Sequence, residues 1–98
     1  MRLKKNNNTK MLCPEYDYYS SVKEKSDNIA ILKYKTNNEM FKIRLYNLIL
    51  NLCNQLIYGY TYTFSKSDLY FISENNIDIF EILKGFKDDI IIMKNRIS

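Results

Sequence analysis

The spacing of apolar positions changes along this chain, and each spacing predicts a different element. A period of two fits residues 28–35, where Ala30, Leu32 and Tyr34 share one face, and this predicts a strand. The strongest helical pattern follows from Met40 to Ile57. Its apolar stripe consists of Phe41, Leu45, Leu48, Ile49, Leu52, Cys53 and Leu56.

The connection between these elements predicts where the helix begins. Thr36-Asn37-Asn38-Glu39 has the form of a capping box, in which Thr36 caps the helix and Glu39 reaches back to it.

The second half of the chain predicts two strands, a helix and a final strand. Residues 58–64 alternate between aromatic and small or polar side chains, and residues 65–68 form a turn into a returning strand at 69–73. Gly85 is suited to ending the next helix, and Asp89 to Lys94 forms a short apolar strand. The inward residues of that second helix are Ile79, Phe80, Leu83 and Phe86.

The resulting order is strand, helix, strand, strand, helix, strand. We therefore expect an α+β, ferredoxin-like βαββαβ fold, with two helices on one face of a four-stranded antiparallel sheet. The other sheet face would be open to a partner. Residues 28–98 form this single domain, and residues 1–27 form an extended basic and aromatic N-terminal arm because no period is sustained there.

An aromatic stripe in the predicted second strand has two possible places. Its rings either stack on a partner at the open sheet face or pack beneath the helices, and we favour packing because few other large residues can fill that position. The stripe consists of Tyr58, Tyr60, Tyr62 and Phe64.

Residue usage indicates origin more clearly than activity. Residues with A/T-rich codons, such as Ile, Asn and Lys, dominate, whereas there are only 2 Gly and 1 Pro. Such a bias is typical of an A/T-rich genome, as in an organelle, a parasite, a low-G/C bacterium or a virus. The net charge of +4 is compatible with an anionic partner and equally with simple solvation. The longest apolar run, Ile90–Met93, is too short for a membrane span.

The available side chains argue against catalysis. The chain has no His, which removes the usual general base, and its two Gly are isolated from any phosphate-binding loop. Asp88 and Asp89 could perform acid–base chemistry or bind a cation, but we expect them to be solvated loop charges. Cys53 lies in the helical pattern and is expected to be a small core residue. We expect no enzyme activity, no cofactor, no bound metal and no small-molecule substrate.

Two short segments carry a family resemblance. Lys33-Tyr34-Lys35-Thr36 precedes the long helix, and Gly59 precedes Ser65-Lys66-Ser67-Asp68-Leu69-Tyr70. This arrangement resembles the S-ten family of small-subunit ribosomal proteins, whose first strand ends in a basic-x-basic-Ser/Thr run. The family's Ser-Pro-His and basic stretch is replaced here by Ser73-Glu74-Asn75-Asn76. The tail from Glu81 to Arg96 is similar to the ribosomal S-six family, which has the same topology.

The resemblance implies a structural component of a mitochondrial or other organellar small ribosomal subunit, encoded in the organelle. It would bind ribosomal RNA and neighbouring ribosomal proteins, with lysines contacting phosphates and the arm docking on the assembly. The lysines concerned are Lys4, Lys5, Lys10, Lys33, Lys35 and Lys66. The alternative is a small viral or bacterial protein–protein interaction module without catalytic activity. It would bind a host or cognate protein, in the viral case in the cytoplasm of an infected host cell.

The salt dependence of association with ribosomes distinguishes these two functions. A ribosomal component should co-sediment with the small subunit from its native source and dissociate steeply as salt rises, because phosphate contacts release counterions. A protein-binding module should stay in the light fractions of a sucrose gradient. Immunodetection across gradients run at low and high salt measures the difference, and absence from ribosomes at low salt contradicts the ribosomal function.

Overall fold

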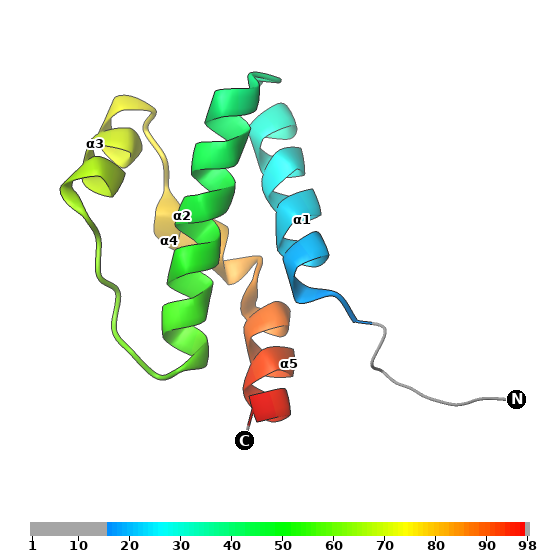
Figure 1. Ribbon diagram of the computed structural model, residues 1–98. Coiled ribbons are helices and arrows are strands. Elements are labelled where there is room, and N and C mark those ends of the chain that lie inside the picture. Colours follow the sequence, from blue (N-terminus) through cyan, green and yellow to red (C-terminus); the bar gives the residue numbers. More distant parts are fainter. Residues whose placement is uncertain (1–15, 98) are drawn as a thin grey trace, which may run out of the picture.

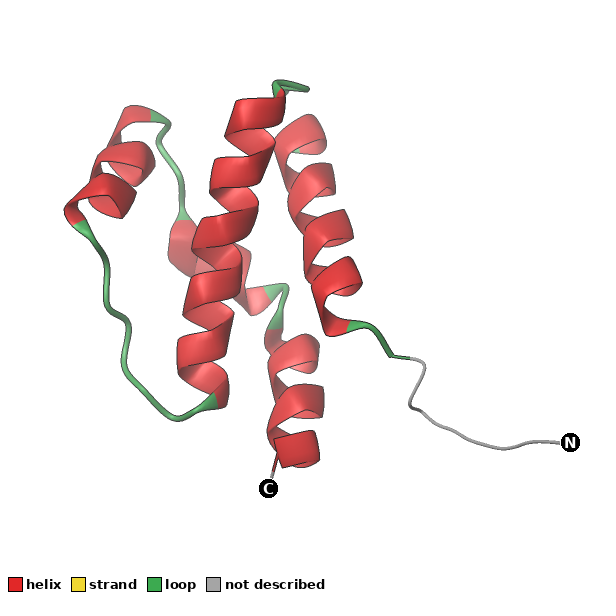
Figure 2. Ribbon diagram, viewed as in Figure 1, coloured by secondary structure: helices red, strands yellow, loops and turns green. Residues whose placement is uncertain are grey.

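The structure is a computed structural model that describes residues 16–97, and within this range every regular element is a helix (Figures 1 and 2). The predicted α+β ferredoxin-like fold is therefore wrong, because no sheet forms in these residues. The helices are α1 (Tyr18–Leu32), α2 (Glu39–Ile57), α3 (Lys66–Glu74), α4 (Ile79–Lys84) and α5 (Lys87–Ile97).

Helices α1 and α2 form an antiparallel pair, against which the rest of the bundle packs. Helix α5 contacts both of them, α4 contacts α2, and α3 stands to one side at the end of a long connection (Figure 1). No helix within residues 16–97 combines the length and the apolar character needed to cross a membrane.

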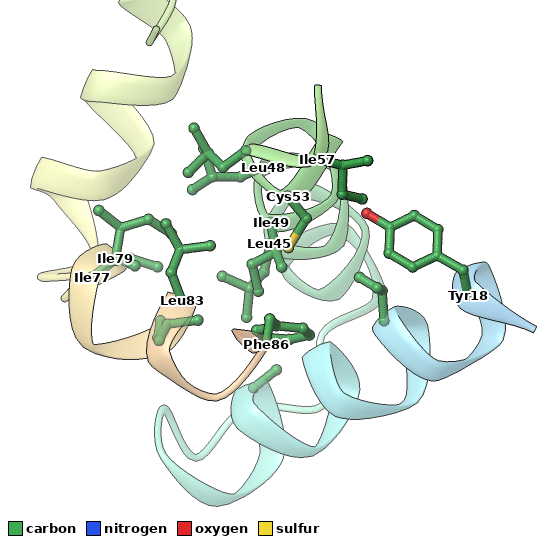
Figure 3. Packing of buried hydrophobic residues seen from close by; sticks show 14 residues of the cluster. Tyr18, Leu45, Leu48, Ile49, Cys53, Ile57, Ile77, Ile79, Leu83 and Phe86 are labelled. Carbon is green, nitrogen blue, oxygen red and sulfur yellow. The ribbon is translucent and has the colours of Figure 1, made fainter. Parts of the chain in front are cut away.

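Helix α2 supplies the centre of the hydrophobic core. The predicted helix at Met40–Ile57 is confirmed, and so is the burial of Cys53. Figure 3 shows Phe86 and Leu83, from the α4–α5 segment, facing α2 side chains such as Leu45. The buried α2 residues of the core are Leu45, Leu48, Ile49, Leu52, Cys53 and Ile57.

The caps of α2 differ from the predicted ones. Asn38 caps the helix by accepting the Phe41 N–H at 2.9 Å, whereas the Thr36 hydroxyl accepts the N–H of Asn38 at 3.1 Å. The predicted Thr36 cap is therefore two residues too early. At the other end Gly59 has a φ of +82°, a conformation that favours glycine, and its N–H bonds to the Leu56 carbonyl at 3.1 Å to close the helix.

Helix α1 crosses the predicted boundary between arm and domain, and the predicted strand at 28–35 is wrong, because residues 28–32 belong to α1 and residues 33–35 to the connection that follows it. Its buried face has only one residue per turn, and the members after the first are small: Tyr18, Val22, Ser26 and Ala30. Small side chains let α1 approach α2 closely. The Ser26 hydroxyl donates to the Val22 carbonyl at 2.7 Å, which satisfies this buried polar group. Lys4, Lys5 and Lys10 lie outside the described residues.

Helix α3 begins where a hairpin turn was predicted. The Ser65 hydroxyl accepts the Asp68 N–H at 3.0 Å, and the Asp68 carboxylate accepts the Ser65 N–H at 3.4 Å. This capping box starts a helix through residues 69–73, so the predicted returning strand is wrong. Arg44 of α2 holds α3 by donating to the Ser67 carbonyl at 3.0 Å and by lying over the Phe71 ring.

The last third of the chain is helical on both sides of Gly85. The predicted second helix with inward Ile79 and Leu83 is confirmed as α4, with Gly85 as its C-cap, although Phe80 is exposed and not inward. The Ile-rich segment from Asp89 to Lys94 is part of helix α5, so the predicted final strand is wrong. Helical spacing places Asp89 inside and Ile90 and Met93 against the core.

A matched pair of substitutions on α2 tests this core. We expect Ile49→Val to lower the free energy of unfolding by about 0.5–1.5 kcal/mol, because it removes one methylene from a fully buried side chain. Ile43→Val makes the same chemical change at an exposed position and should cost less than about 0.5 kcal/mol. Urea unfolding followed by far-UV circular dichroism gives both values, and equal costs would contradict the packing of α2.

Candidate functional site

A buried carboxylate joins α5 to α1. Asp89 is only 3 % exposed, and the Lys25 ammonium donates to its Oδ2 at 2.6 Å. The Ser21 hydroxyl donates to Oδ1 at 2.8 Å, and the Tyr16 hydroxyl also donates to Oδ1. The expectation that both neighbouring aspartates are solvated loop charges is therefore wrong for Asp89, whereas Asp88 is exposed.

The electrostatics of this cluster favour the ionised carboxylate. Burial raises the pKa of Asp89, but hydrogen bonds from Lys25, Tyr16 and Ser21 outweigh it and hold the pKa below its ordinary value. Burial and the hydrogen bond to Asp89 raise the pKa of Tyr16 to about 12. Both carboxylate oxygens already accept hydrogen bonds, so the cluster acts as a structural tie between two helices.

A thiol and a phenol lie near this tie, and neither is activated. Cys53 is fully buried, and burial raises the pKa of its thiol to about 12, which keeps it protonated and a weak nucleophile. The Tyr18 hydroxyl donates to Asn54 Oδ1 at 2.9 Å, and burial raises its pKa as well. Among residues 16–97, no group of three or more His, Cys, Asp or Glu is placed to hold a metal ion.

An open groove of about 500 Å³ lies between the C-terminal end of α2, α4 and α5. Two aromatic rings form one wall, where Tyr62 meets Phe80 edge to face with 5.2 Å between ring centroids. Three lysines, Lys84, Lys87 and Lys94, stand around it. The aliphatic lining residues are Leu56, Leu83, Ile90 and Ile91.

The segment from Tyr58 to Phe64 supplies Tyr62, one of the two rings of the aromatic wall. It runs without strand pairing among the described residues, so the predicted strand is wrong. The Gln55 side chain holds it by accepting the Thr63 N–H at 2.9 Å and donating to the Thr63 carbonyl at 3.1 Å. Tyr60 is 68 % exposed, and Tyr58 and Tyr62 are exposed as well, so the expectation that the stripe packs beneath helices is wrong for its three tyrosines, whereas Phe64 is partly buried against the core.

The lysines beside the groove differ in their pairing. Lys84 lies 3.4 Å from the carboxylate of Glu81, one turn earlier on α4. Lys87 and Lys94 have no carboxylate within 4.0 Å among residues 16–97. The groove therefore presents unneutralised positive charge beside apolar surface.

The lysines predicted to contact RNA do not belong to this groove. Lys33 and Lys35 are exposed in the connection between α1 and α2, and they do not lie on a strand face as predicted. The Lys33 ammonium lies 6.0 Å from the Tyr34 ring centroid. Lys66 is exposed at the start of α3. Sequence reasoning missed the groove because it read Asp89 to Lys94 as a strand. The helical spacing of Lys87, Ile90, Ile91 and Lys94 is the signal that could have found it.

A second hollow lies between α1 and α2, and its charge is partly paired, because only Glu24 among its charged lining residues has no opposite charge within 4.0 Å in residues 16–97. Lys23 pairs with Asp27 at 2.7 Å across one helical turn, and the Lys23 ammonium also lies 5.8 Å from the Tyr46 ring centroid. This hollow offers less unpaired charge and less aliphatic surface than the groove beside α5, which is the stronger candidate.

The fold and the groove define a small helical bundle that presents an open apolar surface beside lysines. Comparison of the chain with protein-family models, curated proteins and solved structures finds no match.

Two neighbouring aspartates on α5 test the structural tie. We expect Asp89→Asn to lower the free energy of unfolding at neutral pH by about 1–3 kcal/mol, because Lys25 and two hydroxyls lose a charged acceptor. Asp88→Asn, at an exposed position in the same turn, should cost less than about 0.5 kcal/mol. Urea unfolding measures both.

The pH dependence of the same variants gives a further check. The pKa of Asp89 is lower in the folded protein than in the unfolded chain, so its stabilisation is complete above the unfolded pKa of about 4. It is lost as pH falls through the folded pKa, because the unfolded state then binds more protons. The difference in free energy of unfolding between wild type and Asp89→Asn should therefore become smaller in acid. A difference that grows in acid contradicts the role of Asp89 as an ionised tie between α5 and α1.

Proposed function

We propose that this protein is a non-catalytic protein–protein interaction module that binds its partner in the groove between α4 and α5. The observation that carries the proposal is contiguous apolar exposure: Ile91 is 45 % exposed and Phe80 is 56 % exposed, and both line one open groove. Contiguous apolar surface with a polar rim is typical of sites where soluble proteins bind partners.

The chemistry of the groove favours binding over catalysis. Its charged lining residues are all lysines, and none of the lining residues carries a carboxylate, a thiol or an imidazole. The buried carboxylate of Asp89 already accepts hydrogen bonds from three side chains on its own scaffold. Leucine and isoleucine side chains suit the apolar side chains of another protein, which pack at the centre of such interfaces.

A second candidate function is RNA binding as a component of a small ribosomal subunit. The observation that favours it is charge, because the chain has a net charge of +4 and exposes Lys33, Lys35 and Lys66. These lysines lie on the α1–α2 connection and on α3, so they would contact phosphates from loops and a helix end and not from a sheet.

Peptide selection against the full chain tests the proposed groove. Random peptides displayed on phage should yield binders of micromolar affinity, because the groove supplies apolar contacts to a partner segment. We expect Ile91→Asp to weaken these binders at least tenfold, since it places a charge in the apolar lining. Fluorescence anisotropy with the selected peptides measures the change.

The matched control lies at the next residue. Ile92 is 37 % exposed but does not line the groove, so Ile92→Asp should leave peptide affinity within about twofold. Circular dichroism of both variants shows whether each keeps its helical content. Selection that enriches no peptide, or peptides that bind Ile91→Asp as well as wild type, would count against the proposed function.

A further inference from the structure

We infer that the occupant of the groove is an amphipathic helix of another protein with carboxylates flanking its apolar stripe. This inference rests on the proposed function and names the chemistry of its partner. Three features support it: the spacing of lysine and isoleucine residues on α5, the lack of carboxylate partners for both of these lysines, and the absence of strands among the described residues.

Helix α5 presents a repeating pattern of charge and apolar surface. Lys87, Ile90, Ile91 and Lys94 are spaced by three, four and seven residues, so they lie on one face and all line the groove. The two lysines are separated by about 10 Å along the helix axis, at about 1.5 Å per residue. At about 100° per residue, this face is turned roughly opposite to buried Asp89.

The charge of this face calls for an anionic partner. Lys87 and Lys94 lack a carboxylate partner among residues 16–97, and both flank the two isoleucines. Lys87 also lies in the first turn of α5, where a cation opposes the helix dipole. Glu81 pairs with Lys84 on the opposite rim and neutralises part of its charge. The positive charge of Lys87 and Lys94 on the α5 side is not neutralised in this way within residues 16–97. Carboxylates from a partner would pair with Lys87 and Lys94 at the edge of apolar contact.

The shape of the site favours a helical partner over an extended one. Residues 16–97 contain no strand, so this part of the chain offers no sheet edge on which an extended peptide could add. A helix can place two carboxylates seven residues apart with apolar residues between them, which matches the lysine and isoleucine spacing on α5. A helix bound in the groove would therefore contact both the isoleucines and the lysines of this face.

Other occupants fit less well. The N-terminal segment of this chain, residues 1–15, carries Arg2 and three lysines, so the lysines around the groove repel it. Single-stranded RNA fits less well because most of the lining is aliphatic, and its two rings, Tyr62 and Phe80, contact each other edge to face and do not form a row of separate stacking platforms. A second copy of this chain has a net charge of +4 and is repelled in the same way.

Three synthetic helical peptides test the inference with the full chain. All share one leucine stripe, and they differ only in two positions seven residues apart, which are both Glu, both Gln or both Lys. We expect the Glu peptide to bind about tenfold more tightly than the Gln peptide at low salt, and the Lys peptide to bind most weakly. Fluorescence anisotropy gives the three affinities.

Charge reversal assigns the preference to α5. The double variant Lys87→Glu with Lys94→Glu should prefer the Lys peptide over the Glu peptide. Lys33→Glu with Lys35→Glu makes the same change in net charge on the α1–α2 connection and should keep the wild-type order. Circular dichroism of both double variants checks that helical content is retained.

Each remaining outcome decides between the two proposals. If the Glu and Gln peptides bind with equal affinity, the acidic partner is overturned. If Ile91→Asp then abolishes the binding of both peptides, the proposed peptide-binding groove still holds. Binding of none of the three peptides also overturns the acidic helix, while the phage selection still tests the proposed function separately. Tighter binding of a uridine oligonucleotide than of the Glu peptide, or self-association abolished by Ile91→Asp, overturns the inference in favour of RNA or of a second copy.

Discussion

The burial of one ionised carboxylate, Asp89, constrains how α5 packs against α1. Asp89 can remain charged inside the bundle only where Lys25, Ser21 and Tyr16 reach it, so α5 must present one particular face to α1. That rotation turns the opposite face outward, with Ile90, Ile91 and two lysines along the groove. A structural ion pair therefore sets the geometry of the surface that we propose for binding. Desolvation of the two charges offsets much of their attraction, so the net stability that the pair contributes is small compared with the cost of removing one partner.

The α1–α2 pair is the platform on which this constraint acts. Val22, Ser26 and Ala30 form a narrow buried stripe on α1, and they pack against the broad apolar face of α2. Large and small side chains thus alternate between facing helices, which lets two helices of very different hydrophobicity form one core. Helix α3 depends much less on this core, since it has no buried residue and is held through Arg44 and Phe71.

Three of the four segments predicted as strands lie wholly or partly in helices and share one physical property, whereas residues 58–64 form a connection. Segments 28–35, 69–73 and 89–94 are short and rich in β-branched or aromatic side chains, and such runs fit a strand or a helix equally well. Side-chain caps stand at the starts of two of the helices that contain these segments: Asp17 caps α1, and Ser65 with Asp68 caps α3. The same Ser65–Asp68 segment fits a turn and a capping box, and only the chain that follows distinguishes them.

The amino-acid sequence by itself determined the long central helix, the burial of Cys53 and the end of α4 at Gly85, because sustained periodicity and a C-terminal glycine are local signals. The tertiary structure alone decided that residues 28–32, 69–73 and 89–94 are helical, that Asp89 is buried while Asp88 is exposed, and that two lysines flank an apolar groove. The burial of Asp89 depends on contacts between residues more than sixty positions apart, such as Lys25 with Asp89, and no local pattern encodes such a contact.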